Sequence, residues 1–113
     1  MFKELLQELQ QTKLVRITGS FADGTQHSNS DIDFRVKPDK PDYRFYGEDR
    51  NILKIINILK KFNIKWESNC PGYIYTHESN NNLPIQIEFS DLFKPRKNKL
   101  PEVEIIGVKF KTF

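Results

Sequence analysis

Residues 19–34 read GSFADGTQHSNSDIDF and hold most of the side chains in this chain that could carry chemistry. The stretch ends in strict alternation, in which Asp31 and Asp33 are separated and followed by large hydrophobic residues. Such alternation predicts a strand with both carboxylates on one face, their Cα atoms about 6.5 to 7 Å apart. A pair of carboxylates at this spacing can share hard divalent cations, and paired cations are a standard device for phosphoryl transfer.

A glycine and a serine, Gly19 and Ser20, open the same stretch. They follow residues 13–18, a short run that predicts a strand, and residues 20–25 are expected to form one or two helical turns. A glycine lets a phosphate approach the backbone, a helix start offers free N–H groups, and the serine hydroxyl adds a donor. The stretch therefore combines a predicted phosphate cradle with a predicted cation site, in that order along the chain.

The rest of the chain predicts a small α+β unit built on a mixed β-sheet. Hydrophobic residues at helical spacing predict two main helices, over residues 2–11 and 49–62, which are expected to pack on the sheet. Further strands are expected at residues 64–67, 72–76, 83–89 and 103–110, with a turn at 80–82 and a bulge at 105–107.

Length and composition restrict the classes of protein that fit. The chain has 113 residues and a formal net charge of +3, so a single domain over residues 1–113 is expected. It contains no run of about 18 apolar residues, and its N-terminus lacks the pattern of a signal peptide, so we expect a cytoplasmic protein without a membrane span. The single cysteine, Cys70, excludes an internal disulfide, and with only two histidines it excludes a Cys/His zinc site.

The pattern resembles the DNA polymerase beta-like nucleotidyltransferase superfamily, in particular its minimal nucleotidyltransferase members. The signature of that superfamily is a Gly-Ser after the first strand, then an Asp-x-Asp, then a third carboxylate on a later strand. Gly19-Ser20 and Asp31-Ile32-Asp33 match the first two parts, and Glu88 fits the third. The resemblance covers nearly the whole chain and implies the polymerase beta-like nucleotidyltransferase fold.

The resemblance also implies an activity, that of a metal-dependent enzyme. It would move a nucleoside monophosphate from a nucleoside triphosphate, with ATP favoured, to a hydroxyl and release pyrophosphate. Asp31, Asp33 and Glu88 would be the catalytic carboxylates and would hold a pair of Mg²⁺ ions, which Mn²⁺ could replace. Gly19 and Ser20 would bind the β- and γ-phosphates. The implied acceptor is a protein, such as a HEPN-type toxin, or the 3′ end of a tRNA, in a toxin–antitoxin or phage system.

Several assignments stay open at this level. Asp91 is an alternative third carboxylate that would otherwise cap a turn, and Asp23 is either a turn residue or a metal contact. The aromatic and basic loop 43–46, together with Arg50, either stacks a base or covers the edge of the core. The basic residues within 94–99 form either a nucleic-acid patch or a solvated loop.

Two functions of other classes compete with the enzyme. One is a non-catalytic protein of the nucleotidyltransferase fold that neutralises a partner by contact. The other is a nucleic-acid-binding module. The intact Gly-Ser and Asp-x-Asp favour the enzyme, because a fold that has lost catalysis usually loses a ligand first.

Overall fold

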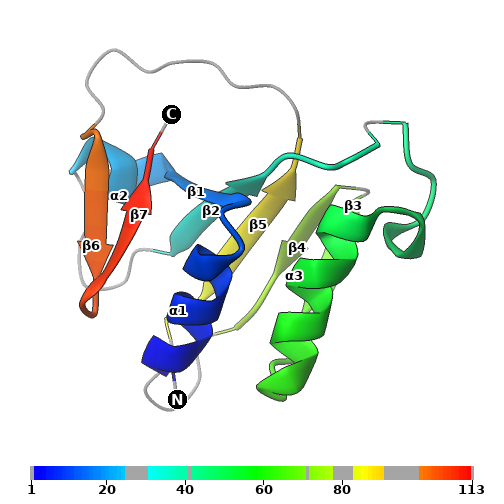
Figure 1. Cartoon of the computed structure of the whole chain (residues 1–113), viewed down its shortest axis with the longest axis horizontal. Coiled ribbons are helices and arrows are strands. Elements are labelled where there is room, and N and C mark those ends of the chain that lie inside the picture. The colour runs from blue at the N-terminus through cyan, green and yellow to red at the C-terminus, as the bar shows by residue number, and fades with distance from the viewer. Residues whose placement is uncertain are drawn as a thin grey trace.

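A computed structural model of the chain describes residues 2–24, 31–40, 42–70, 72–77, 83–90 and 100–112. The helices in this part of the chain are α1 (Phe2–Gln11), α2 (Gly19–Asp23) and α3 (Arg50–Lys61), with a 3-10 turn, η1 (Tyr46–Glu48), before α3. The strands are β1 (Val15–Thr18), β2 (Ile32–Val36), β3 (Glu67–Cys70), β4 (Tyr73–Tyr75), β5 (Ile85–Phe89), β6 (Glu102–Ile105) and β7 (Val108–Lys111). Figure 1 shows their arrangement.

Five of the strands form one mixed sheet in the order β1-β2-β5-β4-β3. β2 and β5 run parallel, whereas β1 with β2, β4 with β5, and β3 with β4 are antiparallel. A parallel pair needs a crossover connection, and the chain between β2 and β5 includes α3 and the β3–β4 pair. The predicted α+β class and mixed sheet are confirmed.

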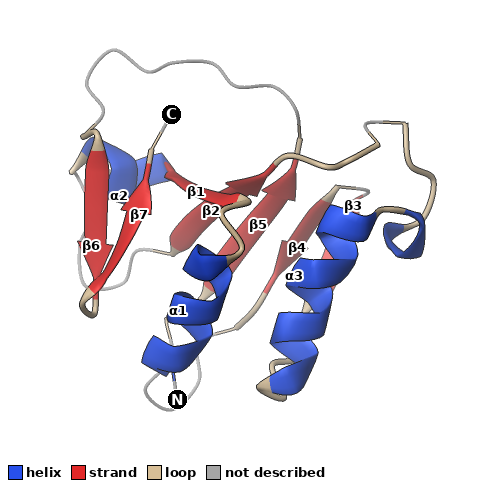
Figure 2. Cartoon of the chain, in the orientation of Figure 1, coloured by secondary structure: helices blue, strands red, loops and turns tan. Residues whose placement is uncertain are grey.

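The two long helices, α1 and α3, lie side by side on one face of this sheet (Figure 2). As the hydrophobic spacing predicts, α1 buries Phe2, Leu5, Leu6 and Leu9, and α3 buries Ile52, Ile55 and Leu59. Alternate residues of β2, β4 and β5 are buried in the same core. No helix among the described residues is long and apolar enough to cross a membrane.

The other face of the sheet carries the residues that alternate with this buried set. They are half-buried or exposed, and we call the surface that they form the open face. Its residues on the four strands β1, β2, β5 and β4 are Arg16, Thr18, Asp33, Arg35, Gln86, Glu88, Tyr73 and Tyr75.

The strand predicted at 64–67 is wrong, because the chain there still completes the end of α3. Asn63 takes a left-handed conformation with φ of 55°, and the Ile64 N–H donates to the carbonyl of Leu59 at 2.9 Å. This hydrogen bond closes the helix in the manner of a Schellman motif. The strand β3 therefore begins only at Glu67. The turn predicted at 80–82 lies outside the described residues.

The single bulged strand predicted at 103–110 is also wrong, since this segment is the hairpin β6–β7. Ile106 and Gly107 between the two strands have φ of 50° and 78°, as a two-residue hairpin turn of type I′ requires. Isoleucine seldom adopts positive φ, so the residue type concealed the turn. The hairpin packs its buried side onto the core, where the ring centroids of Phe110 and Phe34 lie 5.0 Å apart.

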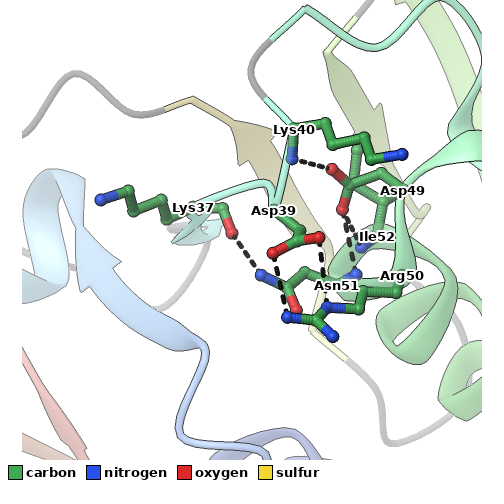
Figure 3. A network of polar contacts seen from close by, with 7 residues as sticks. All are labelled: Lys37, Asp39, Lys40, Asp49, Arg50, Asn51 and Ile52. Atoms are coloured by element: carbon green, nitrogen blue, oxygen red, sulfur yellow. Dashed lines mark hydrogen bonds and ion pairs between the residues drawn. The ribbon is translucent and has the colours of Figure 1, made fainter.

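The start of α3 is fixed by Asp49, a fully buried carboxylate (Figure 3). One of its oxygens accepts hydrogen bonds from the backbone N–H groups of Asn51 and Ile52, both at 3.0 Å, and so caps the helix. The other accepts from the Lys40 N–H at 2.6 Å and ties the loop after β2 to the helix. Burial raises the pKa of Asp49, but these backbone hydrogen bonds outweigh burial and hold the pKa below its ordinary value of 3.8.

Replacing Asp49 by Asn tests this cap. The amide cannot accept from both sides, so one backbone N–H is left buried without an acceptor, and we expect a loss of about 1 to 3 kcal/mol at neutral pH. Because the folded-state pKa is lowered, the advantage of the carboxylate is complete above the ordinary pKa of 3.8 and disappears as the pH falls through the folded value. Urea unfolding at a series of pH values measures both effects.

The control for this prediction is Asp39→Asn. Asp39 forms an ion pair with the exposed Arg50 at 3.1 Å, and a pair of this kind contributes only about 0 to 1 kcal/mol. A difference between wild type and Asp49→Asn that is unchanged down to the lowest pH would contradict the role of the charged carboxylate.

Candidate functional site

Gly19 and Asp33 are in close contact where β1 passes into α2. Gly19 has φ of 72°, which side chains rarely allow, and it lies directly against the carboxylate of Asp33. A Cβ atom on residue 19 would lie 2.9 Å from Cγ of Asp33, and nearer still to Oδ2. Backbone conformation and space therefore both require glycine here. The contact joins the two halves of the sequence motif.

Gln86 is the neighbour of the Asp-x-Asp pair on the next strand. In the parallel pairing of β2 with β5, Asp33 is in register with Gln86. The side-chain amide of Gln86 donates to Oδ2 of Asp31 at 2.6 Å. Both aspartates of the motif therefore meet the same residue of β5, and this residue is neutral.

Glu88 lies two residues further along β5, in register with Arg35. The carboxylate of Glu88 forms an ion pair with the guanidinium of Arg35 at 3.0 Å. The side chain of Glu88 is 46% exposed, whereas that of Arg35 is 19% exposed. The neighbouring strand is thus the one that the sequence predicts for the third carboxylate, but the register gives Glu88 a cationic partner.

A hollow of about 230 Å³ on the open face brings several of these residues together. Eight residues line it, among them Gly19, Asp33, Arg35, Tyr73, Gln86 and Glu88. Ser20 and Asp31 are not among the lining residues. Within the part of the chain that the structure describes, no three His, Cys, Asp or Glu side chains are grouped closely enough to hold a metal ion.

The donor atoms at this site fit a hard divalent cation. Asp31 and Asp33 offer carboxylate oxygens, and Gln86 can add an amide oxygen, which are the ligands that Mg²⁺ and Mn²⁺ prefer. Glu88 can join them only if its carboxylate turns from Arg35 toward Asp33. The residues present therefore fit a cation held mainly by the Asp-x-Asp pair.

The two tyrosines of the loop 43–46 cover the edge of the core, whereas Phe45 is exposed. Tyr43 and Tyr46 are partly buried against the core. The ring centroid of Tyr46 lies 5.5 Å from that of Phe89 and 6.0 Å from that of Trp66. The Tyr46 hydroxyl also accepts a hydrogen bond from the Gly72 N–H at 3.1 Å.

The remaining candidates from the sequence lie away from the hollow or outside the described part of the chain. Asp23 is the last residue of α2 and does not line the hollow. Asp91 and the basic residues within 94–99 are outside the described residues.

Comparison with known families agrees with this geometry. The family model of the nucleotidyltransferase domain matches residues 1–68, more than half of the chain, so the chain belongs to the nucleotidyltransferase domain family. The matched segment contains Gly19, Ser20, Asp31 and Asp33 and ends before Glu88. No curated protein and no solved structure matches the chain.

Two residues of the site, Gln86 and Arg35, were not predicted. Strand alternation alone shows that Gln86 shares a face with Glu88, but not which of the two is opposite Asp33. That depends on the pairing register of two strands far apart in the sequence. Arg35 could have been predicted as a site residue. It follows Asp33 by two residues on the same strand, so alternation places it on the same face as the aspartates.

Proposed function

We propose that this chain transfers a nucleoside monophosphate from a nucleoside triphosphate, with ATP favoured, to an acceptor hydroxyl and releases pyrophosphate. The observation that carries the proposal is the contact of Gly19 with Asp33, because it sets backbone that has no side chain directly beside a carboxylate. A phosphate can approach such backbone closely, and the carboxylate can hold the cation that the phosphate needs. Membership of the nucleotidyltransferase family supports the same general chemistry.

The two halves of the motif would hold different parts of the substrate. Gly19 and Ser20 would bind the β- and γ-phosphates, so that the leaving pyrophosphate stays in line with the attacking oxygen. Asp31 and Asp33 would hold Mg²⁺, or Mn²⁺ in its place. When bound, such cations lower the pKa of an acceptor hydroxyl and offset the charge that develops on the phosphate oxygens. Gln86 would keep the Asp31 carboxylate oriented through its hydrogen bond.

Glu88 is the third carboxylate of the proposal, so its side chain has to leave the ion pair with Arg35 and turn toward Asp33. Glu88 lines the same hollow as Asp33, and its half-exposed side chain has room on the solvent side to turn. At the Glu88 end the ion pair is 46% exposed, so water can solvate the Glu88 carboxylate when it leaves Arg35. Near Asp33, the carboxylate could also accept the proton that the acceptor hydroxyl releases.

The proposed setting is the cytoplasm, in a toxin–antitoxin or phage system. The candidate acceptors are a protein hydroxyl, such as one on a HEPN-type toxin, and the 3′ end of a tRNA. Both present a hydroxyl that can approach the open face of the sheet beside Asp33.

The first test is the fate of labelled triphosphate. With Mg²⁺ or Mn²⁺ and an extract that supplies acceptors, label from α-labelled ATP should enter the acceptor, whereas label from γ-labelled ATP should appear as pyrophosphate. The double change Asp31→Asn with Asp33→Asn should abolish transfer, because it removes both charges that hold the cation. It should also abolish the rise in melting temperature that cation plus triphosphate gives by mass action.

The matched control removes the same two charges elsewhere, by Asp39→Asn with Asp42→Asn in the loop after β2. This control should keep both the transfer and the thermal shift. Full thermal stabilisation and transfer in the Asp31 and Asp33 double variant would show that these carboxylates do not hold the cation.

The second test separates the two roles open to Glu88. We expect Glu88→Gln to lower the transfer rate by about a hundredfold or more, because it removes a carboxylate that acts in the transition state. Arg35→Gln breaks the same ion pair from the other side and should lower the rate by less than about tenfold. Steady-state rates of both variants and of the double variant measure the coupling.

Equal losses in the two single variants, with no further loss in the double variant, would mean that Glu88 serves only Arg35. A near-normal rate in Glu88→Gln together with a collapse in Asp91→Asn would move the third carboxylate to residue 91.

A further inference from the structure

Three aromatic side chains form a row along β4 and its continuation. Tyr73, Tyr75 and His77 alternate along the chain, so they lie on the open face of the sheet. The ring centroids of Tyr73 and Tyr75 are 6.2 Å apart, and those of Tyr75 and His77 are 5.4 Å apart. We call these three residues the aromatic strip. The two tyrosines are half-buried and His77 is exposed, so the strip is accessible from the open face.

The strip lies beside the candidate site. The strand registers place Asp33, Gln86 and Tyr75 in one row across the sheet. Adjacent strands are about 4.8 Å apart, so Tyr75 is about 10 Å from Asp33. Tyr73, at the other end of the tyrosine pair, lines the hollow itself together with Asp33 and Glu88. The strip and the hollow are therefore parts of one continuous surface.

The position of the strip relative to Gly19 indicates which substrate it faces. In an in-line transfer the attacking oxygen and the leaving group lie on opposite sides of the phosphorus. The proposed cradle for the leaving pyrophosphate, Gly19, is on the β1 side of Asp33, since β1 pairs with β2 at that edge. The acceptor must then come from the other side, over β5 and β4, where the strip lies.

We propose that the aromatic strip stacks the unpaired bases of a single-stranded nucleic acid whose 3′ hydroxyl enters the hollow, so that the acceptor is a nucleic acid. This inference rests on the proposed function. An open sheet face with aromatic side chains at alternate positions is a common surface for stacking successive unpaired bases. The 3′ oxygen forms a bond to the α-phosphorus while the bond from that phosphorus to the bridging oxygen breaks. Pyrophosphate leaves, and the hydroxyl proton passes to Glu88 or to water.

Glu67 holds two rings of the strip in place. Its carboxylate lies 2.8 Å from Nε2 of His77, and hydrogen bonds from His77 and Tyr75 lower its pKa. A carboxylate with two ring partners is charged at neutral pH and restricts the orientations of both rings, which lowers the entropy cost of stacking a base on them. The net charge of +3 on the chain favours a polyanion as the partner.

The experiment measures binding of a fluorescent single-stranded oligoribonucleotide of about six nucleotides with a free 3′ hydroxyl, by anisotropy. Tyr75→Ala should raise its Kd about tenfold, and Tyr73→Ala with Tyr75→Ala should raise it further. Tyr75→Phe keeps the ring and should bind nearly as wild type does. Phe45→Ala is the matched control, because Phe45 is a 70% exposed aromatic residue in the loop before η1 and is not part of the strip.

Cross-linking supplies a measurement that does not depend on the folding of a variant. A 5-iodouracil oligonucleotide irradiated with the wild-type chain should attach to the strip, at Tyr73, Tyr75 or His77. The KM for the triphosphate should stay within about twofold of wild type in Tyr75→Ala, because Tyr75 does not line the hollow and the triphosphate lies on the other side of Asp33.

The inference would be overturned by unchanged oligonucleotide binding in the double tyrosine variant, or by cross-links only outside the strip. It would also be overturned if Tyr75→Ala raised the KM for the triphosphate and left the Kd of the oligonucleotide unchanged. Transfer to a protein hydroxyl with no binding of the oligonucleotide would contradict it as well. Binding and cross-linking need no turnover, so the two proposals fail separately. Strip-dependent binding without transfer from any triphosphate supports the strip and refutes the proposed function. Transfer that continues in the double tyrosine variant, with unchanged oligonucleotide binding, supports the proposed function and refutes the role of the strip.

Discussion

The approach of the Gly19 backbone to the Asp33 carboxylate is the constraint on which the candidate site depends. It requires a residue without a side chain, at positive φ, at the junction of β1 and α2. It also requires β1 and β2 to pair so that Thr18 is opposite Asp33, which brings the next residue, Gly19, to the carboxylate. The backbone that we propose binds phosphate and the oxygen that we propose binds the cation become neighbours only under both conditions.

The parallel register of β2 with β5 decides what surrounds that contact. It places Gln86, a neutral donor, opposite Asp33 and leaves Glu88 opposite Arg35. Three carboxylates grouped without cations would repel one another, and the register avoids this by interposing an amide and a guanidinium. The charges on this face are therefore balanced, and the proposed catalytic arrangement would be reached when the half-exposed Glu88 leaves its ion pair with Arg35.

Much of the fold could be predicted because its hydrophobic periods are clear. The two helices α1 and α3 begin and end within a residue or two of their predicted bounds, since their buried residues recur at helical spacing. The Asp-x-Asp strand and the Gly-Ser turn were predicted because alternation and glycine are local signals. The β6–β7 hairpin was not, because Ile106 occupies a turn position where sequence favours Asn, Asp or Gly.

The part of the site that depends on non-local pairing was not predictable from residue types. Whether Gln86 or Glu88 faces Asp33 depends on the alignment of strands separated by a helix and two strands. The position of the aromatic strip also depends on non-local pairing, because Tyr75 lies beside the site only through the pairing of β4 with β5, in which it is opposite Gln86.

The most direct measurement of the central claim is a stability cycle on residues 19 and 33, with Gly47→Ala as the control. A Cβ atom on residue 47 would meet nothing within 4 Å, so this change should be nearly neutral. Gly19→Ala should cost about 1 to 3 kcal/mol and abolish stabilisation by triphosphate and Mg²⁺. Asp33→Ala in the Gly19→Ala background should restore part of the lost stability, because it removes the carboxylate that the new methyl group meets. Additive effects of the two changes, with triphosphate binding intact in Gly19→Ala, would contradict the claim.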